Sequence, residues 1–276
     1  MSKGAVLISG AAGGIGIATV DRFLESGYEV AGIDLSPLVE GLRPERYRGA
    51  VADVTEPAQL ALAVDRLLEG LELKHVVGLA GGMIPEEAKV LVTGDSAAAT
   101  EAFNASLSLN LSGQFSLIHA ALGRLEQADG DRSITLCSSV NALRGYGGPA
   151  YSAAKAGLTG MMHALATPLG ARGIRINVVA PGTTRTPLLD SDLARANDPT
   201  AMDRKAEEVP LGRIGMPADV AAVIESLADR LTYVTDEVIK VDGGHLLAQP
   251  FDRRPIRMVD RVRHRVSRRL GIRPSP

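Results

Sequence analysis

Seven short strand-like segments, of which residues 5–8 are a continuous apolar run, alternate with helical stretches along this chain of 276 residues. A continuous apolar run is typical of a strand that is buried on both faces, and strands that alternate with helices form a parallel sheet covered on both sides. The alternation therefore predicts an α/β fold with a single doubly wound Rossmann-type domain, in which ligands bind at the carboxyl ends of the strands. The predicted strands are 5–8, 28–33, 47–51, 75–79, 134–137, 174–179 and 238–241, and the longest predicted helix is about 97–127.

A glycine-rich segment, residues 10–16, lies between the first predicted strand and a helix that begins near Ile17. Glycines let the backbone approach a pyrophosphate closely, and the free N–H groups at a helix N-terminus face its negative charge. In this context of strand, turn and helix, the segment predicts a phosphate loop for a dinucleotide. An ordinary glycine-rich turn between a strand and a helix is the alternative.

The second predicted strand ends at Asp34, about twenty residues after that segment. A carboxylate at this place accepts hydrogen bonds from the hydroxyls of an adenosine ribose and repels a 2′-phosphate. Neither Gly13 nor Leu35 supplies a positive charge beside it. NAD is therefore the predicted cofactor rather than NADP, and an N-cap or loop Asp is the alternative.

Tyr151 and Lys155 stand four residues apart in an alanine-rich stretch that favours a helix, so they share one helix face. A nearby ammonium favours the phenolate of a tyrosine, and a serine hydroxyl can hold the reacting oxygen. The pair predicts a group that transfers protons. A packed Tyr beside a solvated Lys is the more common reading of this spacing when it stands alone.

The ordered set of these motifs resembles the short-chain dehydrogenase/reductase family over roughly residues 4–247. The glycine segment, Ser138-Ser139, Asn110-Leu111-Ser112-Gly113, the 181–186 run and Val241-Asp242-Gly243-Gly244 carry the resemblance together with the Tyr151 and Lys155 pair. The resemblance implies cofactor-binding roles for Gly10, Gly14, Ile15, Gly16, Asp34, Asp53, Val54, Ala80, Gly81, Tyr151, Lys155, Pro181, Gly182, Thr184 and Thr186.

The resemblance also implies four catalytic residues. Tyr151 would be the acid/base on the substrate oxygen, and Lys155 would lower its pKa and bind the nicotinamide ribose. Ser139 would hydrogen-bond the carbonyl or alcohol, and Asn110 would kink its helix to hold a water that connects Lys155 to solvent. Ser138 has the usual separation from Tyr151 and is the alternative to Ser139, which follows its strand in the same phase as the family serine.

Two departures from the family pattern affect these expectations. The family often has Asn-Asn-Ala-Gly after the fourth strand, whereas this chain has Gly78-Leu79-Ala80-Gly81 and lacks both side-chain amides. Contacts of that turn are therefore expected from backbone groups. Pro168 should kink or end the helix of Tyr151 unless it falls near the last turn, and this matters because that helix commonly forms a dimer face in the family.

The predicted function is an NAD(H)-dependent oxidoreductase that interconverts a secondary alcohol and a ketone by hydride transfer. Few charges occur among the candidate residues of the substrate pocket, which favours a lipophilic or cyclic alcohol. These candidates are Met83, Asn141, Leu143, Tyr146 and the segment 188–202. The alternatives are a non-catalytic nucleotide-binding regulator or scaffold, and a membrane- or nucleic-acid-associated protein that acts through its basic C-terminal tail.

Other features of the sequence narrow the class of protein. Cys137 is the single cysteine and is expected to be a reduced core residue, and we find no secretion signal and no apolar run long enough to span a membrane. We therefore expect a cytoplasmic protein. The five histidines have no metal-ligand spacing, so no metal site is predicted.

The chain is predicted to divide into a cofactor-binding domain, residues 1–249, and a basic extension, residues 250–276. The extension holds nine Arg and two Asp, a formal charge of +7 that leaves −9 for the preceding residues. Its apolar residues recur at helical spacing, which predicts an amphipathic helix. We expect it to dock on the acidic body or a neighbouring subunit of a dimer or tetramer; a membrane surface is less favoured, and nucleic-acid binding is unlikely.

Overall fold

The computed structural model describes residues 2–37, 45–84, 96–144, 148–187, 189 and 200–247. All seven predicted strands are present there and form one parallel sheet in the order β3-β2-β1-β4-β5-β6-β7. Their bounds are β1 Ala5–Ser9, β2 Glu29–Asp34, β3 Tyr47–Val51, β4 Leu73–Gly78, β5 Arg132–Cys137, β6 Ile174–Pro181 and β7 Val238–Val241. The predicted fold class is therefore confirmed.

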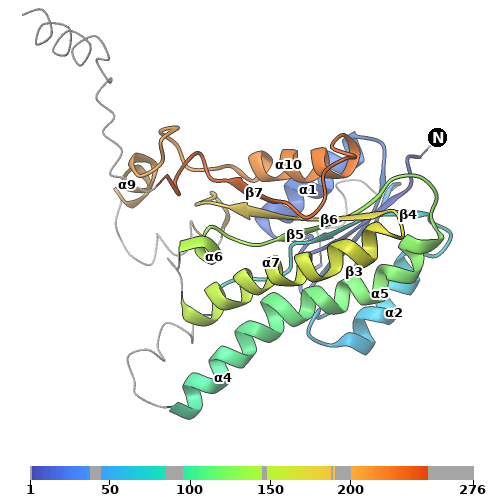
Figure 1. Cartoon of the computed structure of the whole chain (residues 1–276), viewed down its shortest axis with the longest axis horizontal. Helices are drawn as coiled ribbons and strands as arrows, with labels where there is room; N and C mark the ends of the chain where they lie inside the picture. Colours follow the sequence, from blue (N-terminus) through green and yellow to red (C-terminus); the bar gives the residue numbers. More distant parts are fainter. Residues whose placement is uncertain are drawn as a thin grey trace, which may run out of the picture. The chain divides into compact units, whose positions relative to one another are not determined.

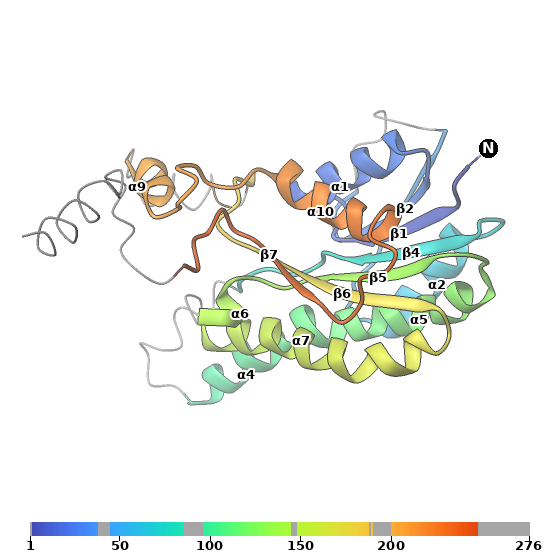
Figure 2. The same cartoon turned by 45° about the horizontal axis from the view of Figure 1, so that its top comes forward.

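Helices cover both faces of the sheet (Figures 1 and 2). One face carries α1 (Gly14–Glu25) and α10 (Pro217–Asp229), and the other carries α2 (Pro57–Leu67), α5 (Gly113–Gln127) and α7 (Pro149–Gly170). The two apolar cores lie between the sheet and these layers. Because both faces are covered, every residue of β1 and of β6 is buried. Residues 5–8 of β1 are accordingly continuously apolar rather than alternating. The polar residues of β6, Arg175 and Asn177, are buried with hydrogen-bond partners.

The strand order places a topological switch between β1 and β4. The chain leaves β1 toward β2 and β3 and then returns to the other side of β1 as β4. Turns that follow β1 and β4 therefore diverge at the carboxyl edge of the sheet and leave a crevice between them. Asp34 at the end of β2, Cys137 at the end of β5 and Pro181 at the end of β6 reach the same edge.

The predicted helix 97–127 is interrupted in the structure. It consists of α4 (Ser96–Leu107), a π-helical turn η1 (Ser108–Ser112) and α5. The interruption agrees with the kink expected at Asn110, which is the buried residue of the turn. Two short helices, α6 (Asn141–Arg144) and α9 (Ala201–Glu207), were not predicted, because neither is long enough to show a clear apolar period.

Pro168 lies in the last turn of α7, which continues to Gly170. A proline removes the hydrogen bond to the residue four positions earlier, here Ala164. Ala164 is exposed, so its carbonyl can bind water instead. Pro168 therefore falls near the last turn, as one of the two expectations allowed, and it does not end α7 early.

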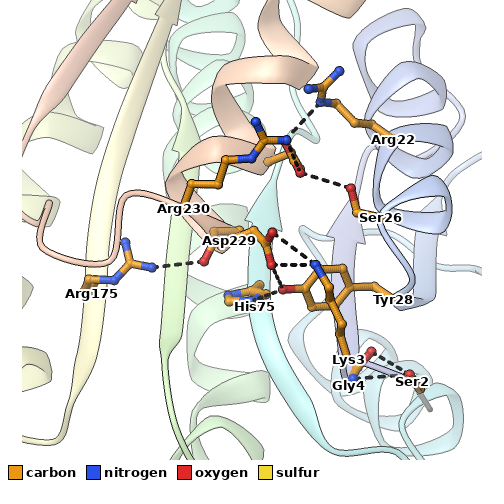
Figure 3. A network of polar contacts seen from close by, with 12 residues as sticks. Ser2, Lys3, Gly4, Arg22, Ser26, Tyr28, His75, Arg175, Asp229 and Arg230 are labelled. Carbon is orange, nitrogen blue, oxygen red and sulfur yellow. Dashed lines mark hydrogen bonds and ion pairs between the residues drawn. The ribbon is translucent and has the colours of Figure 1, made fainter.

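Two polar networks lie at the edge opposite the crevice (Figure 3): one joins α1 to α10, and the other joins α10 to the sheet. In one, the buried carboxylate of Glu225 accepts hydrogen bonds from Arg22, Ser26 and Arg230. In the other, Asp229 accepts from Tyr28 at 2.7 Å and from Lys3 at 3.1 Å, and His75 lies between Tyr28 Oη and Ser133 Oγ.

None of the helices in the part of the chain that the structure describes is long and apolar enough to cross a membrane. Cys137 is a buried free thiol, and burial raises its pKa, in agreement with the expected core role. The basic extension lies outside the described residues, and so does Tyr146.

Candidate active site

Two pockets that share several residues occupy the carboxyl edge of the sheet. One has a volume of about 450 Å³ and lies between the glycine segment, α7 and the segment after β6. The other has a volume of about 410 Å³ and lies over the ends of β1, β2 and β4. Because Gly10, Gly13 and Gly81 line both, the two pockets form one continuous candidate site for an elongated ligand.

The glycine segment is shaped by three close approaches of backbone. Gly10 has φ +71°, and a Cβ there would lie 2.6 Å from the backbone nitrogen of Ala80 in the turn after β4. A Cβ on Gly16 would lie 2.0 Å from the carbonyl oxygen of Gly10. A Cβ on Gly14 would meet the side chain of Thr186 at 3.0 Å. The spacing of these glycines is therefore what lets the turn, the start of α1 and the segment after β6 converge, as a phosphate loop requires.

Two carboxylates line the second pocket. Asp34 Oδ2 accepts the Ala12 N–H of the glycine segment at 2.9 Å, and its Oδ1 accepts the N–H of Ser36 at 3.0 Å. Asp53 accepts both the N–H and the hydroxyl of Thr55, at 2.8 and 2.7 Å. Both carboxylates are thus fixed by hydrogen bonds at the pocket edge, from Ala12 of the glycine segment and from the neighbouring residues Ser36 and Thr55, and none of these partners is a cation.

α7 brings Tyr151 and Lys155 to the first pocket. Lys155 Nζ lies 5.6 Å from the centre of the Tyr151 ring and donates to the carbonyl oxygen of Cys137 at 2.8 Å. The Lys155 side chain is buried, and this burial lowers its pKa. An ammonium in such a place has its aliphatic stem enclosed and its position set by β5, so it can act on the neighbouring phenol with little freedom to move away.

Ser138 and Ser139 both line this pocket but make different hydrogen bonds. The hydroxyl of Ser138 is buried and donates to the backbone carbonyl of Lys155 at 2.8 Å. The hydroxyl of Ser139 is only partly buried and accepts the N–H of Asn141 at 3.1 Å. The Ser139 hydroxyl can therefore still donate its own proton to a ligand in the pocket. The Ser138 hydroxyl already donates its proton to the Lys155 carbonyl of α7.

Asn110 lies behind the pockets. Its side chain accepts the N–H of Gly82 at 2.9 Å and donates to the carbonyl of the same residue at 3.0 Å. It also donates to the Ser106 carbonyl at 3.1 Å, across the π-helical turn. A Cβ on Gly81 would meet Asn110 Oδ1 at 2.6 Å and Lys155 Nζ at 3.1 Å, so the amide, the turn and the lysine are packed together.

The structure brings nearly all the predicted site residues together. Every one of them except Asn110 lines one or both pockets. Among the candidate substrate residues, Met83 and Asn141 line the first pocket, Leu143 is exposed, and Leu188 and residues 190–199 lie outside the described ranges.

Gln114 was missed in the sequence analysis. Its amide nitrogen donates to the carbonyl of Ala80, and the side chain is fully buried. Its spacing of four residues from Asn110 was the signal available, since residues i and i+4 lie on one side of a helix. As expected, the turn after β4 offers only backbone groups, but side chains of Ser9, Asn110 and Gln114 bind them.

No group of three metal-binding side chains occurs among the described residues. The site consists instead of a glycine cradle, two fixed carboxylates, a phenol with a buried ammonium, and hydroxyls. Such a set fits a nucleotide and a proton transfer.

Comparison with known proteins agrees with this reading. A family model described as enoyl-(acyl carrier protein) reductase matches residues 10–245. The chain is 36% identical to the 3-oxoacyl-(acyl-carrier-protein) reductase FabG of Thermotoga maritima over 251 residues, covering 86% of this chain and 96% of that protein. It is 32% identical to the L-fucose dehydrogenase of Mus musculus over 248 residues, which cover 87% of each chain.

Among solved structures, an oxidoreductase of the short chain dehydrogenase/reductase family from Burkholderia thailandensis matches with a TM-score of 0.78 and 29% identity, over 99% of both chains. The matches extend from the glycine segment to the end of the sheet and include both pockets. The chain therefore belongs to the short-chain dehydrogenase/reductase family of oxidoreductases, whose cofactor is a nicotinamide dinucleotide.

Proposed function

We propose that this oxidoreductase interconverts a secondary alcohol and a ketone with NAD(H), and that Tyr151 is its acid/base. The observation that carries the proposal is that Tyr151, Lys155 and Ser139 line the same pocket as the glycine segment. A hydride donor or acceptor held by that segment would therefore lie beside a proton-transfer group.

Each residue of the site has a separate role in this reaction. A nicotinamide bound here would accept the hydride of the alcohol carbon in the direction of oxidation, and residues 10–16 would hold the cofactor phosphates. In the direction of oxidation, Tyr151 takes the hydroxyl proton of the substrate while the Ser139 hydroxyl holds the same oxygen. Lys155 stabilises the phenolate, since a buried ammonium gains most from a nearby anion. Asn110 keeps the turn at Gly82 in place behind the lysine.

Asp34 is the basis for proposing NAD over NADP. Both of its carboxylate oxygens face backbone N–H groups at the rim of the second pocket. A 2′-phosphate at this rim would meet a fixed negative charge, while ribose hydroxyls would find an acceptor. Leu35 and Ser36, which follow it in that pocket, supply no compensating cation.

The substrate is proposed to be a lipophilic or cyclic secondary alcohol. Met83 and Pro187 give the first pocket an apolar rim, and Asn141 adds one polar group to it. The matched mouse relative is named for a sugar, which is itself a cyclic alcohol, so sugars belong in the same test. A homodimer or homotetramer, a cytoplasmic location and docking of the basic extension on a neighbouring subunit also remain proposals.

Tyr151→Phe tests the mechanism. Removing the hydroxyl should lower kcat by at least about 100-fold, since a positioned acid/base contributes that much, while the Kd for NADH stays within about threefold. Turnover is followed by NADH fluorescence at alkaline pH across a panel of secondary alcohols that includes sugars and apolar rings. Tyr233→Phe, at a fully exposed position, is the matched control. Undiminished turnover in Tyr151→Phe would refute the mechanism.

Lack of turnover on the whole panel, despite tight NADH binding, would favour the alternative of a nucleotide-binding regulator.

The cofactor choice is tested by NADH and NADPH titrations of the unmodified protein and of Asp34→Ala. We expect tighter binding of NADH in the former, and a shift of about tenfold or more toward NADPH in the variant, because a like-charge contact is removed. Asp65→Ala removes an exposed carboxylate on α2 and should shift neither affinity. A preference of the unmodified protein for NADPH would contradict the role given to Asp34.

A further inference from the structure

Gln114 is a fully buried amide at the start of α5, and it does not line either pocket. Its Nε2 donates to the carbonyl oxygen of Ala80. Since a carbonyl only accepts, this contact fixes which end of the amide faces the turn. The other end, Oε1, is buried and has no hydrogen-bond partner among the described residues.

Gly78 provides the space for this amide. A Cβ on Gly78 would lie 2.0 Å from Gln114 Oε1 and 3.1 Å from its Cδ, distances at which the two side chains could not coexist. Gly78 is the last residue of β4, between Ser9 of β1 and Leu136 of β5. The two positions therefore share one volume, and the absence of a side chain at residue 78 is what admits Gln114.

The turn after β4 is held from three sides. Ser9 Oγ accepts the N–H of Ala80 at 3.3 Å, Gln114 binds the carbonyl of Ala80, and Asn110 binds both backbone groups of Gly82. Residues 80–82 line the second pocket, and Gly81 and Gly82 line the first as well. The peptide that Gln114 holds is thus part of the wall on which a dinucleotide would lie.

We propose that Gln114 is a positioning residue of the cofactor site and that it forms a coupled pair with Gly78. The end of β4 and the turn after it have no side-chain amide of their own. Gln114 of α5, four residues beyond Asn110, supplies one. This inference rests on the dinucleotide site proposed above and adds to it a residue that touches neither cofactor nor substrate.

The first test replaces the amide by an apolar side chain of similar length. Gln114→Met removes the side-chain donor to the partly buried Ala80 carbonyl, so we expect the Kd for NADH to rise about tenfold, with kcat at saturating NADH within about twofold. Gln127→Met places the same change at the exposed end of α5 and should leave the Kd unchanged. Unchanged affinity in a Gln114→Met protein that melts at the unmodified Tm would overturn the inference.

The second test exploits the shared volume and does not depend on Gln114→Met folding. Gly78→Asn alone should collide with Gln114 and weaken NADH binding, and Gln114→Ala alone should also weaken it. In Gly78→Asn/Gln114→Ala, the Asn side chain would occupy the space that the Gln114 amide leaves. Its amide nitrogen could then donate to the Ala80 carbonyl. We expect the double variant to bind NADH at least about fivefold more tightly than the weaker single variant, a non-additive effect of residues in contact.

A double variant that binds no better than the weaker single variant would overturn the coupling. The outcomes also separate this inference from the proposed function. If the unmodified protein fails to bind NADH, the cofactor proposal falls and this inference with it. If the unmodified protein binds NADH and the Gln114 variants bind equally well, only this inference falls.

Discussion

Two adjacent serines differ in the direction of their hydroxyl hydrogen bonds. Ser138 donates to the carbonyl of Lys155 and so ties the end of β5 to α7, whereas Ser139 accepts from Asn141 and keeps its proton on the pocket side. A hydroxyl that holds a substrate oxygen needs a free proton to donate. The geometry therefore favours Ser139 as the candidate, even though Ser138 has the more usual distance along the chain from Tyr151.

This difference predicts opposite effects of two matched substitutions. Ser139→Ala should lower kcat about 100-fold, the usual cost of losing one donor to a reacting oxygen, and leave Tm nearly unchanged. Ser138→Ala should lower Tm, because the buried hydrogen bond from the Ser138 hydroxyl to the Lys155 carbonyl is lost, and should change kcat by less than about tenfold. Steady-state kinetics and thermal melts of both variants test which serine holds the substrate oxygen. A larger loss of kcat in Ser138→Ala than in Ser139→Ala would assign this role to Ser138.

At the scale of elements, the start of α1 is locked against the turn that precedes it. Gly16, in the first turn of the helix, faces the carbonyl of Gly10 so closely that no side chain fits. The backbone on both sides belongs to the pocket wall, so neither can shift without opening the phosphate loop. A helix N-terminus is useful for binding an anion only if its N–H groups stay at this place.

Gly16→Ala should therefore lower both stability and cofactor affinity, although alanine favours helices. We expect a loss of about 2 kcal/mol or more in the free energy of unfolding, comparable to other overpacked sites. The matched control is Gly123→Ala in α5, where an added Cβ meets nothing within 4 Å; it should gain about 0.5–1 kcal/mol from helix propensity. Urea denaturation and NADH titration test both variants, and equal stabilisation by the two changes would show that the close approach is unimportant.

At the scale of the whole described domain, one network joins parts of the chain that are far apart in sequence. Lys3, Tyr28, His75 and Asp229 lie side by side in Figure 3. Together with Ser133, which is hydrogen-bonded to His75, they link the N-terminal segment, the start of β2, the strands β4 and β5, and α10. Because the proton of Tyr28 goes to Asp229, His75 Nε2 donates to Tyr28 Oη. In a neutral imidazole, Nδ1 then accepts the hydroxyl proton of Ser133.

Burial and the neighbouring charges shift the pKa values of His75 and Asp229 in this network. Burial is the main cause that lowers the pKa of His75 to about 4, and the carboxylates of Asp131 and Asp229 oppose it in part. Burial is also the largest single influence on Asp229 and acts to raise its pKa, but hydrogen bonds from Tyr28 and Lys3 hold the pKa below its usual value. The network is therefore stable with a neutral His75 beside an ionised Asp229.

The pH dependence of stability follows from His75. In the unfolded chain its pKa is near 6.5, so the unfolded state takes up a proton as pH falls from 6.5 toward 4 while the folded state does not. The stabilisation is present above pH 6.5 and is lost as pH falls to about 4, by up to about 3 kcal/mol. Urea denaturation at several pH values measures this slope.

His75→Gln should flatten the profile in that window, whereas His119→Gln, on the exposed face of α5, should not change it. A profile that is as steep in His75→Gln as in the unmodified protein would exclude His75 as its source.

The chain's sequence determined the class of fold and the candidate site to a large extent. Continuous apolar strands can only be buried on both faces, so the alternation predicts the parallel sheet, and every strand was found within a few residues of its predicted place. Parallel strands bring their carboxyl ends to one edge, so Gly10, Asp34, Tyr151 and Pro181 could be assigned to one site before their contacts were known.

Only the tertiary structure decided how that site is held together. Local pattern carries no information on which buried amide meets which carbonyl, so the contact of Gln114 with Ala80, and the room left for it by Gly78, could not be predicted. The same holds for Ser138 and Ser139, whose neighbouring hydroxyls differ only in what β5 and α7 place beside them. Sequence periodicity determines which face of an element is buried, but hydrogen bonds between distant segments exist only once the elements have packed.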